Sequence, residues 1–191
     1  MDLSSQPQAW ESLALSQDIP KAVSQMLASH GPFPAFSMDR NWDLIEYNDA
    51  AQLLFVFGGV DGAGNLLDAI IASADSPDYV NWPEAAAFIL QRLARDIEKS
   101  GGNHTLERYF SQIQEHPRYQ PAHADKKAGD QQTNDRISVF RLNSQKLMLY
   151  SAMAVFETIG GDDLSDIRVE LMFPVDPETR AFFARLNSAV H

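Results

Sequence analysis

The segment 136–175 constrains the fold more than any other part of the chain, because its apolar residues recur at every second position in three successive stretches. The stretches read "RISVFRL", "KLMLYSAMAVFET" and "DIRVELMFPV", and they are joined by "NSQ" and "IGGDDLS". A period of two is typical of strands, and the short polar joints favour antiparallel neighbours. The sequence therefore predicts a three-stranded antiparallel meander.

The middle strand of this meander carries apolar residues on both faces. Its two alternating sets are Leu147, Leu149, Ser151, Met153 and Val155 on one side, and Met148, Tyr150, Ala152, Ala154 and Phe156 on the other. A strand of this kind is expected to be covered on both sides. The small residues Ser151, Ala152 and Ala154 either let a helix approach closely or leave space for a ligand, and both explanations are open.

A second strand pair is predicted near the start of the chain. "FPAFSM" and "WDLIEY" are strand-like and flank the turn "DRN", whose Asp and Asn side chains can bond their own backbone. Trp42 is expected to pack beside that turn. Asn48 follows the second strand and is predicted to cap the helix "DAAQLLFVF" with its side-chain oxygen.

Helical periodicity marks the remaining elements. Residues 1–17 form a flexible lead-in, and an amphipathic helix follows over 18–29 with Pro20 in its first turn. Pro83 begins the longest helix, Gly101 and Gly102 end it, "NHTLERYFSQIQEH" is the next helix, and "DPETRAFFARLNSAV" is the last. The glycine-rich stretch 58–65 lacks the motif of a phosphate loop and is predicted to be a flexible connector. The polar stretch 117–135 is predicted to be a surface loop.

This order of elements has one economical solution, an α+β fold of the PAS-like type. A five-stranded antiparallel sheet carries helices across one face, and the N- and C-terminal helices pack on the outside, against the second face. Such a fold encloses a pocket between sheet and helices, lined here by aromatic and aliphatic residues. The ligand-binding domain is predicted to span 18–191.

Composition narrows the function. A net charge of -11 repels phosphate backbones, so the chain by itself is a poor nucleic-acid binder, and the absence of cysteine excludes disulfides and thiolate chemistry and fits a cytoplasmic protein. No window is apolar enough to cross a membrane. The five histidines are scattered, no metal site is expected, and no set of nucleophile, base and orienting residue is recognisable, so the chain is not predicted to be an enzyme.

Three blocks of the sequence carry a family resemblance. "PFPAFSMDRNWDLIEYNDAAQLLF", "VNWPEAAAFILQRLARD" and "LMLYSAMAVFETIGGDDLSDIRVELMFPVDPETRAFFARL" resemble, in this order, the ligand-binding domain of MmyB-like bacterial transcription regulators. The likeness covers approximately residues 20–187. In that family an XRE-type helix-turn-helix precedes a PAS-like domain, and the segment before residue 18 is too short and too polar to hold one. The chain is therefore expected to be an excised domain or a stand-alone sensor.

The resemblance implies a sensor that holds a small apolar or fatty-acid-like molecule, without an obligatory cofactor, and signals to a DNA-binding domain outside this chain. It marks these residues as family-motif positions: Asp39, Arg40, Trp42, Asn48, Asn81, Trp82, Phe156, Arg168, Glu170 and Phe173. Arg168 and Glu170 share one face of a strand and are either an exposed pair or part of a site. Arg168 or Arg92 is expected to meet a ligand carboxylate, because a guanidinium binds carboxylates bidentately.

The pocket lining is predicted from the apolar stripes of elements that must face one another. The predicted ligand-binding residues are Phe36, Phe55, Phe88, Arg92, Leu149, Met153, Arg168, Leu171 and Phe173. A homodimer is expected. The alternative function is a dimerisation or protein-interaction module with a fully packed core and no ligand, formed through the exposed helix 18–29 or 177–190.

Overall fold

The computed structural model describes residues 9–57, 64–119, 136–142, 144–156 and 167–189, with side chains described from residue 19 to 186 within these ranges. The helices in this part of the chain are α1 (Ala9–Ser29), α2 (Asp49–Phe57), α3 (Leu66–Ala72), the short 3₁₀ helix η1 (Ser73–Asp75), α4 (Trp82–Lys99), α5 (His104–Gln114) and α6 (Pro177–Ala189). The strands are β1 (Ala35–Met38), β2 (Leu44–Tyr47), β3 (Ile137–Leu142), β4 (Gln145–Phe156) and β5 (Ile167–Pro174). The predicted connector 58–65 and loop 117–135 lie largely outside the described residues.

The strands form one five-stranded sheet in the order β2-β1-β5-β4-β3, and every neighbouring pair is antiparallel. The meander β3-β4-β5 and the hairpin β1-β2 are both as predicted, and the hairpin joins the meander through β1 and β5. The predicted α+β fold of PAS-like type is confirmed.

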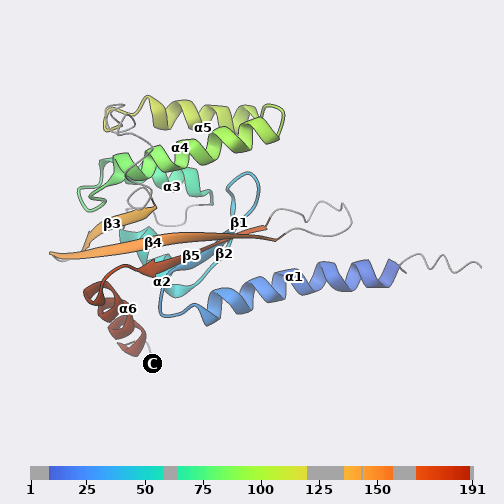
Figure 1. Ribbon diagram of the computed structural model, residues 1–191, viewed down its shortest axis with the longest axis horizontal. Helices are drawn as coiled ribbons and strands as arrows, with labels where there is room; N and C mark the ends of the chain where they lie inside the picture. Colours follow the sequence, from blue (N-terminus) through green and yellow to red (C-terminus); the bar gives the residue numbers. More distant parts are fainter. Residues whose placement is uncertain (1–8, 58–63, 120–135, 143, 157–166, 190–191) are drawn as a thin grey trace, which may run out of the picture.

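The sheet separates two layers of helices (Figure 1). Helices α3, α4 and α5 lie over one face, which we call the upper face, and α1 and α6 lie on the other, lower side. Helix α2 packs against β1, where the rings of Phe36 and Phe55 lie 5.6 Å apart between centroids. The predicted division between central helices on one face and terminal helices on the other therefore holds.

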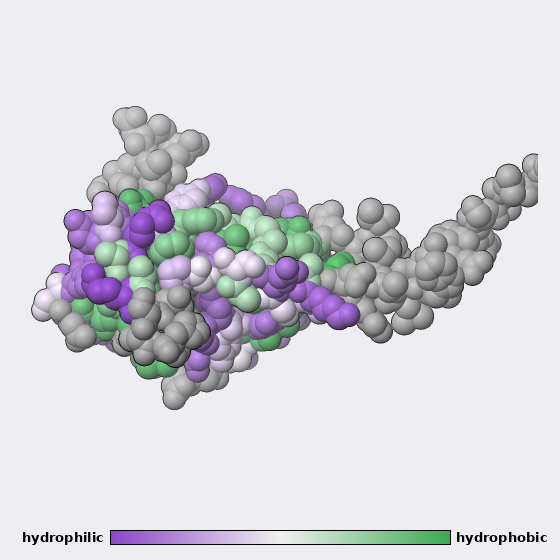
Figure 2. All heavy atoms as spheres, turned by 90° about the horizontal axis from the view of Figure 1, so that it is seen from below, coloured by the Kyte–Doolittle hydropathy of each residue, from purple (hydrophilic) through white to green (hydrophobic). Residues whose placement is uncertain are grey.

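Most of the core lies between the sheet and the upper helices. Its fully buried residues include Trp42, Trp82, Leu93, Leu106, Ile113 and Leu149. A smaller cluster on the lower side joins α1 to the sheet, with Val23 and Leu27 packed on Ala35 and Val169. Seen from below, the surface around α1 and α6 mixes polar and apolar residues (Figure 2).

The turn between β1 and β2 follows the predicted side-chain chemistry. The Asp39 Oδ1 atom accepts hydrogen bonds from the backbone N–H groups of Asn41 and Asp43 at 2.7 and 2.9 Å. This turn places Trp42 in the left-handed region, with a φ of 69°, a conformation that non-glycine residues rarely adopt. The Trp42 side chain is fully buried there.

The side chain of Asn48, between β2 and α2, forms hydrogen bonds to several segments of the chain. Its Oδ1 accepts from the N–H of Ala51 at 3.0 Å, which is the predicted helix cap, and also from the N–H of Ala35 at 3.1 Å. Its Nδ2 donates to the carbonyl oxygens of Leu27 and Phe33. The cap therefore also ties the end of α1 to the first hairpin.

Two expectations need correction. Helix α1 begins at Ala9, within the predicted lead-in, and Pro20 lies inside the helix instead of its first turn, because the helix-forming residues before it continue the helix at the cost of one backbone hydrogen bond. Strand β4 is not covered along its whole length, since Met153 and Val155 are 45% and 49% exposed. The apolar residues of β4 therefore extend beyond the part of the strand that the helices cover.

Candidate functional site

A cavity of about 90 Å³ lies between the upper face of the sheet and helices α2, α3 and α4. One water molecule needs roughly 10–15 Å³ on the same measure, so the space accommodates several water-sized groups. Its lining residues are Phe36, Leu54, Phe55, Leu66, Ala69, Ile70, Ser73, Tyr79, Ala85, Phe88, Ile89, Arg92, Arg136, Ser138, Phe140, Ser151, Glu170 and Met172. The walls are mainly aliphatic and aromatic, which is usual for sites that hold small molecules.

Helical and strand periodicities explain which residues reach the cavity. On α4, the positions Ala85, Phe88, Ile89 and Arg92 are three or four residues apart and share one face of the helix. On the sheet, side chains alternate, so Ser138 and Phe140 of β3 face the cavity together. Short side chains, including Ala69, Ala85, Ser138 and Ser151, leave the space unfilled.

A tyrosine supplies a polar group in the wall. The hydroxyls of Tyr79 and Ser138 lie 3.1 Å apart and form a hydrogen bond. Burial raises the pKa of Tyr79 from 10.0 to about 12, the Ser138 hydrogen bond opposes the rise, and Glu170 adds a smaller contribution in the same direction as burial. The phenol therefore keeps its proton at neutral pH and offers a neutral donor or acceptor.

Arg92 forms the charged part of the wall and is only 7% exposed. Its Nη1 donates to Glu170 Oε2 at 2.9 Å, its Nη2 donates to Met153 Sδ at 2.9 Å, and its guanidinium carbon lies 4.5 Å from the centroid of the Trp42 ring. Among the described side chains, Arg92 Nε is the one buried nitrogen or oxygen atom without a hydrogen-bond partner. An unsatisfied buried donor costs about 1–3 kcal/mol, so Arg92 is held in this position at some cost to stability.

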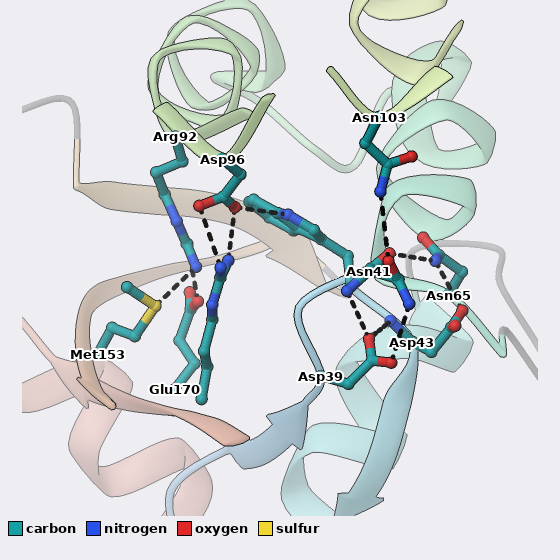
Figure 3. A network of polar contacts seen from close by, with 11 residues as sticks. Asp39, Asn41, Asp43, Asn65, Arg92, Asp96, Asn103, Met153 and Glu170 are labelled. Carbon is teal, nitrogen blue, oxygen red and sulfur yellow. Dashed lines mark hydrogen bonds and ion pairs between the residues drawn. The ribbon is translucent and has the colours of Figure 1, made fainter. Parts of the chain in front are cut away.

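A second ion pair lies one helical turn further along α4. Arg168 binds Asp96 bidentately, with N–O distances of 2.5 and 3.0 Å, and Trp42 Nε1 donates to Asp96 Oδ2 at 3.0 Å. Figure 3 shows Asp96 and Arg92 side by side, with Glu170 and Met153 below Arg92. The two pairs link α4 to β5, and Trp42 contacts both.

Polar side chains of the first turn extend this network. Asn65 Nδ2 donates to the Asn41 carbonyl at 3.0 Å and to Asp43 Oδ1 at 2.8 Å. Asn103 Nδ2 reaches Asn41 Oδ1 at 3.4 Å (Figure 3). These contacts attach the start of α3 and the α4–α5 connection to the turn that positions Trp42.

The structure brings part of the predicted ligand-binding set to the cavity, namely Phe36, Phe55, Phe88 and Arg92. Arg168 and Met153 lie on the same sheet face but outside the cavity, at Asp96 and Arg92 respectively. Leu149 is buried in the upper core without lining the cavity. Whether any of these residues contacts a ligand stays a prediction.

Leu171 and Phe173 lie on the opposite, lower side of the sheet. Leu171 packs on the α1 cluster, and the Phe173 ring is 4.9 Å from the ring of His30. Successive side chains of a strand point to opposite faces of the sheet. Since Glu170 and Met172 of β5 face the cavity, Leu171 and Phe173 must face away from it. The prediction combined residues of both parities on one strand, although only one parity can reach the pocket.

The interpretation of Arg168 and Glu170 as an exposed pair is wrong. Both are largely buried, and each binds a residue of α4 instead of the other. Among the lining residues that the sequence did not single out, Met172 and Phe140 could have been found from strand parity with Glu170 and Ser138. Tyr79 lies in an irregular connection, where no periodicity indicates its position.

The structure also bears on two other kinds of site. Within the described ranges, no three His, Cys, Asp or Glu side chains converge as metal ligands. None of the helices in those ranges is long and apolar enough to span a membrane.

Comparison with protein-family models gives one match. Residues 19–186 match the model described as the MmyB-like transcription regulator ligand binding domain. The comparison with curated proteins finds no significant match. The family match covers the sheet, the upper helices and the cavity between them.

Proposed function

Because the chain belongs to the family of MmyB-like transcription regulator ligand binding domains, we propose that the cavity between α4 and the sheet is its ligand site. The family assignment makes the chain a ligand-binding domain of transcription regulators, which supports a regulatory role. The single observation that carries the proposal is an apolar cavity of about 90 Å³ whose wall includes the buried ion pair of Arg92 and Glu170.

The proposed ligand is a small, mainly apolar molecule of the fatty-acid type. Aromatic and aliphatic walls favour hydrocarbon, at about 25 cal/mol per Å² of apolar surface removed from water. The polar residues Tyr79, Ser138 and Arg92 in the wall supply a few contacts that orient the molecule. This combination of apolar walls with sparse polar groups is characteristic of specific small-molecule sites.

The proposed signal passes through α4. Arg92 lines the cavity, binds Glu170 of β5 and stacks on Trp42, and Trp42 binds Asp96 one turn further along the helix. A ligand that contacts Arg92 alters the balance of these contacts and shifts α4 relative to the sheet. In the proposed regulator, a DNA-binding domain senses this shift, and a homodimer presents it to DNA.

A cavity-filling variant tests the ligand site. Ala85→Leu adds a branched side chain to α4 where it lines the cavity, and Ala94→Leu makes the same change at an exposed position of the same helix. With octanoate or decanoate at a hundredfold excess over Kd, the melting temperature of the wild type is expected to rise by about 5–10 °C. Ala94→Leu retains this rise, and Ala85→Leu loses it.

Native mass spectrometry of the purified protein adds a second readout. We expect a copurified apolar molecule in the wild type and in Ala94→Leu, and its loss in Ala85→Leu. An Ala85→Leu protein that responds to both acids as strongly as the wild type would show that the ligand binds elsewhere. A wild type that neither carries nor binds an apolar molecule would contradict the proposed function.

A further inference from the structure

The cavity contains two arginines, and only one of them has a carboxylate partner. Arg92 pairs with Glu170, so this part of the wall is neutral overall. Arg168 lies outside the cavity and is neutralised by Asp96. Arg136 also lines the cavity, and among the residues that the structure describes it has no ion pair. It therefore supplies the net positive charge of the site.

Arg136 is held at the solvent side of the cavity. It directly precedes β3, and its carbonyl oxygen accepts the Ser151 N–H at 3.0 Å, so the backbone is fixed against β4. Its guanidinium carbon lies 6.0 Å from the centroid of the Phe88 ring, and its Nη1 donates to the Tyr150 hydroxyl at 3.4 Å. The side chain is exposed, unlike Arg92, and the contact of Nη1 with Tyr150 is its one side-chain hydrogen bond within the described part of the chain, although a guanidinium has five N–H donors.

We propose that Arg136 recognises the acidic group of the ligand at the mouth of the cavity, while the apolar part of the molecule lies inside. The inference rests on the proposed function of the cavity as a ligand site. A carboxylate at Arg92 would stand beside Glu170, and two like charges in a poorly solvated space repel each other strongly. At Arg136 the same carboxylate meets a guanidinium without an ion pair to any described residue, and it stays partly hydrated.

This assignment makes Arg136 the residue that selects acids over neutral molecules of the same shape. Arg92, which is already paired with Glu170, contacts uncharged parts of the ligand. In this assignment, the Phe88 ring beside Arg136 covers the first carbons of the ligand's hydrocarbon chain. The acidic head and the apolar tail of the ligand are then recognised by adjoining side chains.

The test compares a charged probe with a neutral one on two matched variants. Arg136→Gln removes the charge at the cavity. Arg141→Gln makes the same change at an exposed arginine of β3 that does not line the cavity. Binding of octanoate and of 1-octanol to the wild type and to both variants is measured by isothermal titration calorimetry at low and at moderate salt.

We expect Arg136→Gln to weaken octanoate binding about three- to tenfold at low salt and to leave 1-octanol binding unchanged. The loss shrinks at higher salt, because the contact is partly exposed. Arg141→Gln binds both probes as the wild type does.

The remaining outcomes separate the inference from the proposed function. If Arg136→Gln binds octanoate as tightly as the wild type, the head group lies elsewhere and the inference fails while the ligand site stands. An equal loss for both probes would mean that Arg136 acts on the shape of the cavity and not on charge, which also overturns the inference. If the wild type binds neither probe, the proposed function itself fails.

Discussion

The two ends of helix α4 meet the same sheet in different ways. Toward its N-terminus, Ala85, Phe88 and Ile89 border a cavity, and toward its C-terminus the space is closed by Trp42, whose side chain is fully buried. The helix is continuous across both ends, from Trp82 to Lys99. The difference therefore arises from what faces the helix, and not from the helix itself.

The size of the side chains that face α4 explains why its N-terminal part, which we call the hollow end, borders a cavity. We call its C-terminal part, beside Trp42, the closed end. Ser138 and Ser151 of the sheet and Ala69 of α3 leave space there, whereas at the other end an indole and an ion pair fill it. Arg92 stands at the boundary, since it lines the cavity and also stacks on Trp42. A ligand at the hollow end is thus one side chain away from the closed end.

The largest expected effect comes from opening the closed end. Trp42→Ala removes a fully buried indole together with its hydrogen bond to Asp96 and its contact with Arg92, and should lower the free energy of unfolding by about 3–5 kcal/mol. Phe88→Ala, at the half-buried edge of the cavity, should cost only about 1–2 kcal/mol. Urea unfolding of the two variants measures the contrast, and equal losses would show that the two ends are packed alike.

The ion pair at the closed end gives the next effect. Arg168→Met leaves Asp96 largely buried, with the Trp42 Nε1–H as its remaining side-chain partner among the described residues, and should cost about 3 kcal/mol. Adding Asp96→Asn removes the uncompensated charge and should recover roughly half of that loss. Denaturant midpoints of the single and double variants test this, and a double variant no more stable than Arg168→Met would mean that the charge of Asp96 is not what destabilises the single variant.

The sequence predicted the fold well, because the decisive patterns are local. Period two over 136–175, the turn at Asp39 and the cap at Asn48 each depend on a few neighbouring residues, and all of them appear in the structure. The start of α1 was less predictable, because Pro20 is a common first-turn residue that a helix can also tolerate inside.

The cavity could be predicted only in part, because it depends on which side chains oppose one another across elements. Apolar periodicity on α4 pointed to Phe88, and Arg92 was predicted separately as a residue that could bind a ligand carboxylate. The structure places both in the cavity wall. If the alternation of side chains along β5 had been applied strictly, the predicted lining set would have contained Met172 instead of Leu171. The partners of Arg168 and Glu170 could not be predicted, because both lie on α4, more than seventy positions earlier in the chain.

The smallest expected effect is on the pH dependence of stability, and it tests whether water is excluded from Tyr79 at the hollow end of α4. Burial raises the pKa of Tyr79 to about 12, so above pH 10 the unfolded chain releases a phenol proton that the folded chain keeps. The stabilisation is fully present below pH 10, and it is lost as the pH rises from 10 toward 12, with a loss of about 1 kcal/mol by pH 11.

Tyr79→Phe isolates this contribution, because all other groups that titrate at high pH are common to both proteins. Urea unfolding at pH 9, 10 and 11 should show the stability of the wild type falling more steeply than that of Tyr79→Phe, whose constant loss of the Ser138 hydrogen bond shifts its curve without changing its slope. Parallel curves would mean that water reaches the phenol in the folded protein. The cavity end of α4 would then be a hydrated cleft, and the contrast with the closed end would be one of solvation as well as of side-chain size.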